Sequence, residues 1–260
     1  MQRIDFNADI GPWAFRYLEC KTVAATLELM DEHGIDMALA GPVPGITYRN
    51  CHAANEELAR EIAACPQAAG RILQAAVLNP VYPGVEEDFR RCFQQMGCRT
   101  LKLYPNYHGY QCWRSEAVEL CRMAARHGAP VQIVVRVEDE RFHHWKMLIP
   151  ATPLDDILKL VQAVEGCSFV LTGCSTPEAS RFLHSTQDRA ECMVELSYVK
   201  SPFNAVEAFL KAHGSDRALY GTHLPFVYPA VSTEKVTRAN ISPQDLQAIV
   251  HGNAARILGL

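Results

Sequence analysis

The chain has 260 residues, of which 48% are hydrophobic and 21% charged, and its formal net charge is −4. This composition is typical of a globular protein and excludes disorder as the main state. A nucleic-acid partner is not expected, because there is no surplus of basic residues. A membrane association is not expected either, because no apolar run reaches the roughly 18 residues that a spanning helix needs.

The start of the chain and its cysteines point to a cytoplasmic protein. The first residues lead directly into an apolar segment, so we expect no signal peptide. The ten cysteines are scattered without a C-x-x-C pair, which is typical of reduced, buried thiols. We therefore predict a single cytoplasmic domain that covers residues 1–260.

Short apolar segments alternate with segments of helical periodicity along the whole chain. The predicted strands are 3–10, 35–40, 71–78, 99–104, 130–137, 168–172, 191–196 and 217–221. The predicted helices are 22–33, 55–64, 85–96, 115–127, 154–164, 178–183, 203–213 and 242–258. Eight strand–helix units favour an α/β fold of the (β/α)₈ TIM-barrel type, with parallel strands inside and helices outside.

The regions between these elements narrow the choice of function. The longest irregular segments, 138–152 and 222–240, follow the fifth and eighth strands, at the end of the barrel where TIM-barrel enzymes carry their chemistry. The sequence contains neither G-x-G-x-x-G nor G-x-x-x-x-G-K-[ST], so it lacks the usual cradles for dinucleotide and nucleoside-triphosphate phosphates.

Alternation along the strands predicts which side chains line the barrel mouth. In the first strand the apolar side chains, which we expect to meet the helices, are Ile4, Phe6, Ala8 and Ile10. The polar side chains on the opposite face are Asp5, Asn7 and Asp9. By the same rule, the side chains pointing inward near the ends of later strands are Lys102, Tyr104, Arg136 and Glu195. His223 follows the eighth strand, so a polar cluster is predicted at the mouth.

Three motifs together carry a resemblance to a known family. Residues 5–11 (DFNADIG) resemble the opening D-x-H-x-H-x-G of the amidohydrolase-related superfamily, in its second group of small TIM-barrel, metal-dependent hydrolases and decarboxylases. Residues 220–226 (YGTHLPF) are similar to the G-[ST]-D-x-P turn of this group. Residues 249–260 (IVHGNAARILGL) are similar to its closing helix, I-x-x-x-N-A-x-R-L-x-x-L. The resemblance implies a barrel enzyme.

Most of the metal ligands of this family are replaced. The positions of its histidines on strands one, five and six hold Asn7 and Asp9, Val134 and Gly173, and its aspartate on strand eight is His223. We therefore expect no cofactor. The alternative is one divalent metal, zinc, at Asp9 and His223, with Glu195 or Cys174 as a further ligand. A dication about 6 Å from Lys102 or Arg136 would be repelled by roughly 5 kcal/mol, unless the lysine were carbamylated.

We predict that Asp9, His223 and Lys102 are the catalytic residues. Asp9 and His223 would move protons or activate water, while Lys102 and Arg136 would hold a substrate carboxylate and stabilise an oxyanion. The alternative for the first pair is a buried hydrogen bond that closes the first strand to the eighth. The alternative for the two cations is structural pairing with Glu195 or Glu138.

A further set of residues is predicted to bind the substrate. They are Asn7, Tyr104, His108, Arg136, Asp139, Arg141 and Glu195. His108 lies in an aromatic loop after the fourth strand, which is suited to covering a small ligand. Asp139 and Arg141 follow the fifth strand directly, although a run of charges is also typical of a solvated loop.

We predict a hydrolase of a small carboxylate-bearing ester, lactone or amide. Only the resemblance supplies the reaction class, since a fold alone does not fix a reaction. Two alternatives stay open: a decarboxylase or other lyase of the same family, and a non-catalytic barrel that binds small molecules. The expected partner is a small-molecule carboxylate, and homo-oligomerisation is left open.

Overall fold

The computed structural model describes residues 2–143 and 148–260, and in this part of the chain eight parallel strands follow one another in sequence order. The strands are β1 (Ile4–Ile10), β2 (Met37–Pro42), β3 (Ile72–Val77), β4 (Thr100–Leu103), β5 (Val131–Val134), β6 (Phe169–Thr172), β7 (Cys192–Glu195) and β8 (Ala218–Leu219). The segment after β8 returns to β1, where the Asp9 N–H donates to the Leu224 carbonyl at 2.7 Å. The predicted (β/α)₈ barrel is confirmed.

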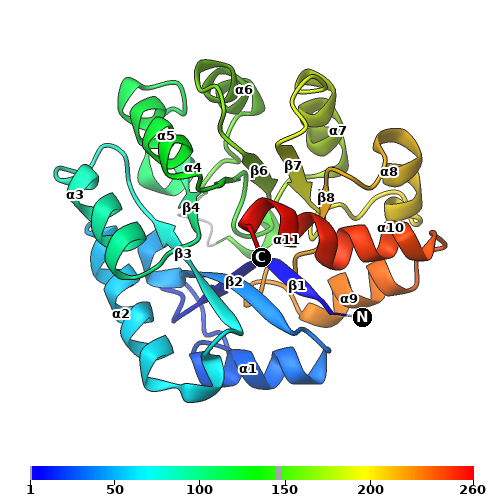
Figure 1. The fold of residues 1–260 in the computed structure, drawn as a ribbon, viewed down its shortest axis with the longest axis horizontal. Helices are drawn as coiled ribbons and strands as arrows, with labels where there is room; N and C mark the ends of the chain where they lie inside the picture. Colours follow the sequence, from blue (N-terminus) through cyan, green and yellow to red (C-terminus); the bar gives the residue numbers. More distant parts are fainter. Residues whose placement is uncertain (1, 144–147) are drawn as a thin grey trace.

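Helices surround the strands on the outside of the barrel (Figure 1). The helices are α1 (Val23–Glu32), α2 (Cys51–Ala64), α3 (Val85–Arg90), α4 (Pro105–His108), α5 (Ser115–His127), α6 (Leu154–Ala163), α7 (Thr176–Ser185), α8 (Ala205–His213), α9 (Pro229–Thr237), α10 (Pro243–Gln247) and α11 (Asn253–Leu258). Shorter 3₁₀ and π segments are η1 (Val43–Ile46), η2 (Pro66–Ala68), η3 (Arg91–Gln95), η4 (Glu140–Phe142) and η5 (Ala248–Gly252). In the described part of the chain, no helix combines the length and the apolar character that a membrane crossing requires.

Strand β1 changes register along its length. Its pairing with β2 shifts between Asp5 and Ala8. Ile4 and Phe6, in the first half of the strand, pack inside the barrel in a cluster whose other members are Leu39, Ala75, Val170, Met193, Leu219, Ala254 and Leu258. The prediction that Ile4 and Phe6 face the outer helices is therefore wrong, because a strict two-residue period does not continue across a register shift.

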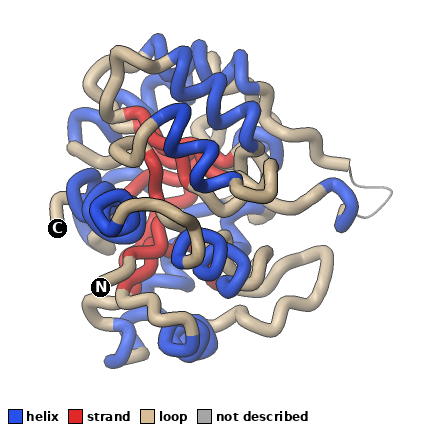
Figure 2. The backbone as a smooth tube through the Cα atoms, turned by 90° about the vertical axis from the view of Figure 1, so that its right-hand side faces the viewer, coloured by secondary structure: helices blue, strands red, loops and turns tan. Residues whose placement is uncertain are grey.

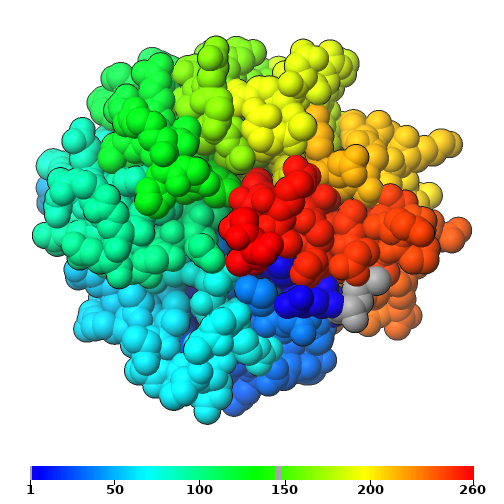
Figure 3. Space-filling model, in the orientation of Figure 1, coloured from blue at the N-terminus to red at the C-terminus, as the bar shows by residue number. Residues whose placement is uncertain are grey.

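The amino-terminal end of the barrel is closed by the carboxyl-terminal helices. Side chains of α11 join the inner cluster, and Asn253 fixes this helix by donating from Nδ2 to the carbonyls of Ser215 and Ala218, at 2.8 Å each. The red segment lies across the centre of this end in the space-filling view (Figure 3). The longer loops extend at the side opposite the two termini (Figure 2). The carboxyl ends of the strands are thus the accessible place for a site.

The two predicted long loops differ in structure. Segment 222–240 is not irregular throughout, because α9 occupies part of it. This helix begins with Pro229 at its first position, a place that suits proline, and it buries Val236 against the core. In segment 138–152 the described residues include the short η4, and residues 144–147 lie outside the described part of the chain.

Candidate functional site

Lys102 lies at the centre of a buried polar cluster at the carboxyl end of the barrel. Its Nζ donates to Asp9 Oδ1 at 2.8 Å, to Asn7 Oδ1 at 3.0 Å and to the Ala8 carbonyl at 3.2 Å. The Lys102 and Asp9 side chains are each only 1% exposed. An ammonium group buried to this degree requires such partners, since burying it unpaired costs several kcal/mol. The structure thus brings together three of the residues that the alternation of β1 and β4 predicts to meet.

Tyr104 completes the surroundings of the Asp9 carboxylate. The Tyr104 hydroxyl donates to Asp9 Oδ1 at 2.9 Å, and this ring is also fully buried. Burial raises the pKa of Asp9, and the nearby Lys102 opposes that rise. Burial and the neighbouring Asp9 raise the pKa of Tyr104 well above its usual value, so the phenol keeps its proton.

His223 is a neutral imidazole with both ring nitrogens engaged. Asn7 Nδ2 donates to His223 Nδ1 at 2.8 Å, and His223 Nε2 donates to the Val137 carbonyl at 2.6 Å. These contacts select the tautomer that is protonated on Nε2. Burial lowers the pKa of His223 to about 3. The predicted partnership of Asp9 with His223 is therefore indirect, since Asn7 and Lys102 connect the two residues.

Glu195 is the second carboxyl group that contacts Asn7. Its Oε2 accepts from Asn7 Nδ2 at 2.9 Å and from the Ser197 hydroxyl at 2.8 Å. Burial raises the pKa of Glu195. Gly221 lies against this side chain, because a Cβ placed there would be 2.5 Å from Glu195 Oε1. The motif glycine after β8 thus makes room for a buried carboxyl group, which is a close approach that only glycine allows.

Arg136 lies outside this cluster, contrary to the prediction. Its guanidinium group forms a two-pronged ion pair with Glu178, at 2.7 and 2.6 Å, and donates to the Gly173 carbonyl. Strand β5 ends at Val134, so the alternation of the strand does not extend to Arg136. This arginine instead joins the loop after β5 to the beginning of α7. The structural pairing foreseen as its alternative is present, although with a different carboxylate.

The other predicted binding residues lie at the periphery. Asp139 and Arg141 form an exposed ion pair with each other at 2.8 Å, which fits the solvated-loop alternative. His108 contacts the Tyr104 ring edge-on, with centroids 6.2 Å apart, but its own polar contact is with the Gly45 carbonyl at 3.0 Å. His108 thus borders the buried cluster without a hydrogen bond to it.

An aromatic cover over the cluster is a feature that the sequence analysis missed. Trp13, from the loop after β1, contacts Tyr107 and Phe226 edge-on, with ring centroids 5.7 and 5.1 Å apart. Trp13 also shares an apolar cluster with Tyr104. Side chains from the loops after β1, β4 and β8 therefore meet next to the buried polar groups.

Glu138 holds this cover in place. Its Oε2 accepts from Trp13 Nε1 at 2.8 Å, and its Oε1 accepts from Arg16 Nε at 2.6 Å. Glu138 follows β5, whereas both donors follow β1, so one buried carboxylate links opposite sides of the mouth. No local sequence pattern signals a contact between residues 125 positions apart.

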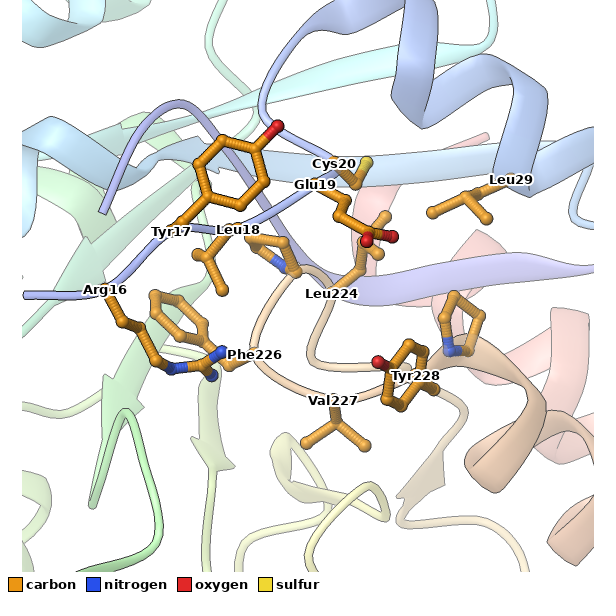
Figure 4. Close-up of a pocket in the computed structure, with 12 residues that line it drawn as sticks. Arg16, Tyr17, Leu18, Glu19, Cys20, Leu29, Leu224, Phe226, Val227 and Tyr228 are labelled. Carbon is orange, nitrogen blue, oxygen red and sulfur yellow. The ribbon is translucent and has the colours of Figure 1, made fainter. Parts of the chain in front are cut away.

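The loop that carries Trp13 also borders a cavity. This cavity has a volume of about 260 Å³ and lies between the loops after β1 and β8. Figure 4 shows Arg16 beside Phe226 at one end of it, with Glu19 and Tyr228 along its walls. The cover is thus packed against an adjacent open space.

Comparisons with known proteins agree with this fold. A family model described as amidohydrolase matches residues 15–260, so the chain belongs to the amidohydrolase family. No curated protein matches the chain. Among solved structures, 5-carboxyvanillate decarboxylase from Sphingomonas paucimobilis has a TM-score of 0.77 at 15% identity and covers 100% of this chain and 99% of its own.

Two further solved structures represent the range of activities. Dihydroxybenzoic acid decarboxylase from Polaromonas sp. JS666, with bound manganese and the inhibitor 2-nitroresorcinol, has a TM-score of 0.78 at 14% identity, covering 100% of this chain and 97% of that one. A candidate 2-pyrone-4,6-dicarboxylic acid hydrolase from Pseudomonas putida has a TM-score of 0.69 at 16% identity, covering 99% and 97%. Identities this low establish a shared fold. The hydrolase prediction stays a prediction, and the decarboxylase alternative fits these relatives at least as well.

The expectation of no cofactor is overturned by the manganese-bound Polaromonas structure, since a relative of the same fold holds a divalent metal. The residues of this chain, however, do not fit such an ion at Asp9 and His223. Asp9 Oδ1 already accepts from Lys102 and Tyr104, and both nitrogens of His223 are engaged. Within residues 2–143 and 148–260, no three His, Cys, Asp or Glu side chains form a group that could hold a metal.

Proposed function

We propose that this chain is a decarboxylase that acts on a small carboxylic acid, with Lys102 as the proton donor. The observation that carries the proposal is the Lys102 ammonium group, which lies at the carboxyl ends of the strands, beside Asp9. The decarboxylases among the structural relatives support the same class of reaction.

Decarboxylation replaces a carboxylate by a hydrogen atom. The carbon–carboxyl bond breaks, its electron pair stays on the substrate carbon, and carbon dioxide leaves. That carbon then takes a proton from Lys102 Nζ, and the lysine regains a proton from solvent after the product leaves. The three N–H groups of Lys102 donate to Asp9, Asn7 and the Ala8 carbonyl, so the ammonium group has to give up one of these hydrogen bonds when it delivers a proton to the substrate carbon. Proton delivery by a positioned acid is a common source of rate enhancement.

Asp9 would favour the loss of carbon dioxide. A substrate carboxylate held near Lys102 also lies near the Asp9 carboxylate, and two buried negative charges repel each other. The repulsion disappears when neutral carbon dioxide forms, so it raises the energy of the bound substrate more than that of the product. The hydrogen bond from Tyr104 to Asp9 keeps the aspartate in this position.

Hydrolysis is less well supported by the geometry. It requires a base that takes a proton from water, and His223 was predicted for this role. Burial lowers the pKa of His223 to about 3, so it is a weak base. Proton donation, by contrast, matches the ammonium and phenol groups that the cluster offers.

The substrate must pass the aromatic cover. Trp13 and Arg16 both bond to Glu138, so the loop after β1 has to release this carboxylate before a ligand can reach Lys102. Loop movements of this kind are common in barrel enzymes.

The test is incubation of the purified chain in D₂O with 2,6-dihydroxybenzoate or 5-carboxyvanillate, with and without added manganese. The expected result is release of carbon dioxide and a product with one deuterium at the carbon that lost the carboxylate. Lys102→Met should lower the rate by roughly 10²-fold or more, since the proton donor is lost. The control Lys159→Met removes an exposed lysine from the outer helix α6 and should leave the rate unchanged.

Two results would refute the proposal. One is hydrolysis of esters or lactones by the chain without any release of carbon dioxide. The other is decarboxylation at an undiminished rate in folded Lys102→Met protein.

A further inference from the structure

A second cavity lies at the carboxyl end of the barrel, beside the aromatic cover. It has a volume of about 390 Å³ and is bordered by the loops after β2, β3 and β4. Binding sites for small molecules have volumes of about 300 to 1,000 Å³. Among the described residues, the lining includes one arginine, Arg49, and no aspartate or glutamate. The cavity therefore presents a net positive charge in a chain whose overall charge is −4.

Several hydrogen-bond donors of this lining are unused. In the described part of the chain, Arg49 forms no ion pair, and the hydroxyls of Tyr82 and Tyr107 and the side-chain N–H₂ of Asn79 have no protein acceptor. Tyr48 differs, because its hydroxyl is 3.4 Å from Glu57. A guanidinium group with neighbouring phenols is the donor set that binds a carboxylate strongly.

His108 contributes no charge to this cavity. Its Nε2 lies 3.0 Å from the Gly45 carbonyl and donates to it, and its buried Nδ1 has no hydrogen-bond partner among residues 2–143 and 148–260. Burial lowers the pKa of His108 to about 4, so the ring is neutral at pH 7. Cys51 Sγ is 3.6 Å from this imidazole, and burial raises the pKa of Cys51 to about 12, which keeps it a thiol. The cavity is therefore suited to binding and lacks an activated nucleophile.

The remaining walls are apolar and aromatic. Tyr48, Tyr82 and Tyr107 provide rings, and Ile46, Val81 and Pro83 provide aliphatic surface. Such walls suit a flat organic body better than a small hydrated ion.

We propose that this cavity binds a planar organic carboxylate, with Arg49 as the charged contact. The inference does not rest on the proposed decarboxylation. The cavity adjoins the reaction site because Tyr107 lines it and also contacts Trp13, at 5.7 Å between ring centroids. It is nevertheless distinct from the Lys102 cluster, since Tyr104 and His108 lie between them.

The test is isothermal titration of the full chain with sodium benzoate, and with benzamide as the neutral analogue. Benzoate should bind in a 1:1 ratio and benzamide much more weakly. Arg49→Gln should weaken benzoate binding roughly tenfold. Arg99→Gln is the matched control, because Arg99 is also exposed and lies before β4, at the opposite end of the barrel.

Each of the other outcomes overturns the inference. If Arg49→Gln keeps full affinity, Arg49 does not hold benzoate and the binding site is elsewhere. Equal affinity for benzamide would show that the carboxylate charge does not determine binding. No measurable heat with the wild-type protein would show that the cavity does not bind benzoate. Thermal unfolding verifies that each variant is folded. The decarboxylation assay is independent of this titration, so a missing carbon dioxide signal does not affect the conclusion about this cavity.

Discussion

Replacing Lys102 by methionine tests the buried ion pair directly. The variant leaves Asp9 buried with only Tyr104 as a donor among the side chains that now contact it. Removing one partner of a buried pair costs about 3 to 5 kcal/mol, because the other charge stays buried without compensation. In a chain of this size, 1 kcal/mol corresponds to about 2 to 4 °C in the melting temperature, so a decrease of roughly 10 °C is expected.

The double variant Lys102→Met with Asp9→Asn separates charge from packing. It removes both members of the pair, so it should be more stable than the sum of the two single changes by about 2 kcal/mol. Urea titrations of all four proteins give the coupling free energy. The control Lys159→Met removes a lysine that is 58% exposed and should change stability by less than about 1 kcal/mol.

The pH dependence provides a second readout. Burial raises the pKa of Asp9, and the loss of Lys102 raises it further. A carboxyl group with a raised pKa in the folded state stabilises the protein below its unfolded pKa, and this contribution is lost as the pH rises. The penalty in Lys102→Met should therefore be larger at pH 8 than at pH 5. A melting temperature equal to that of the wild type, or strictly additive double-variant energies, would refute this account.

Three further predictions follow from single contacts. Burial lowers the pKa of His223 to about 3, so the folded state loses stability as the pH falls below about 6.5, the pKa of an unfolded histidine. Urea titration at pH 6.5 and pH 5 should show that the free energy of unfolding decreases by roughly 2 kcal/mol more in the wild type than in His223→Gln. Equal decreases in the two proteins would contradict this prediction. In Glu138→Gln the side chain can accept a hydrogen bond well from only one of its two donors, Trp13 and Arg16. Hydrogen exchange in the loop after β1, measured by mass spectrometry, should therefore accelerate roughly tenfold. Unchanged exchange would show that other contacts hold this loop. Gly221→Ala places a Cβ 2.5 Å from Glu195 and should lower the free energy of unfolding, measured by thermal unfolding, by about 1 to 3 kcal/mol. The control is Gly252→Ala in a helix, where the nearest atom to the new Cβ is 3.7 Å away, and this change should not destabilise the chain. Equal effects of the two substitutions would contradict the packing argument.

The barrel was predictable from sequence because each strand is a short apolar run followed by a helical repeat, which is a local signal. The position of Lys102 followed from the same alternation, since β4 is regular up to Leu103, and Tyr104 is the residue directly after the strand. The assignment of Ile4 and Phe6 was wrong because the register shift in β1 arises from the pairing with β2, which the sequence of one strand does not reveal.

The remaining errors concern residues beyond the ends of strands. Arg136 was placed in the mouth by extending the alternation of β5 past Val134, where the strand has already ended. The contact between Trp13 and Glu138 joins two loops across the barrel and depends on the closed sheet as a whole. Loop geometry of this kind has no local period, so it could be found only from the structure.

The charges of the buried cluster favour a role in proton delivery. Asp5, Asp9 and Glu195 are all buried carboxyl groups, and burial raises the pKa of each. Asp5 and Asp9 lie near the ammonium group of Lys102, and Glu195 lies near that of Lys235 in α9, so three buried negative charges would face only two positive charges. Asp5 and Glu195, which lack the direct ion pair that Asp9 forms with Lys102, therefore retain protons more readily than exposed carboxyl groups do. Such a proton-rich environment keeps an acid available where a substrate carbon needs one, whereas a hydrolase would need a free base at the same place.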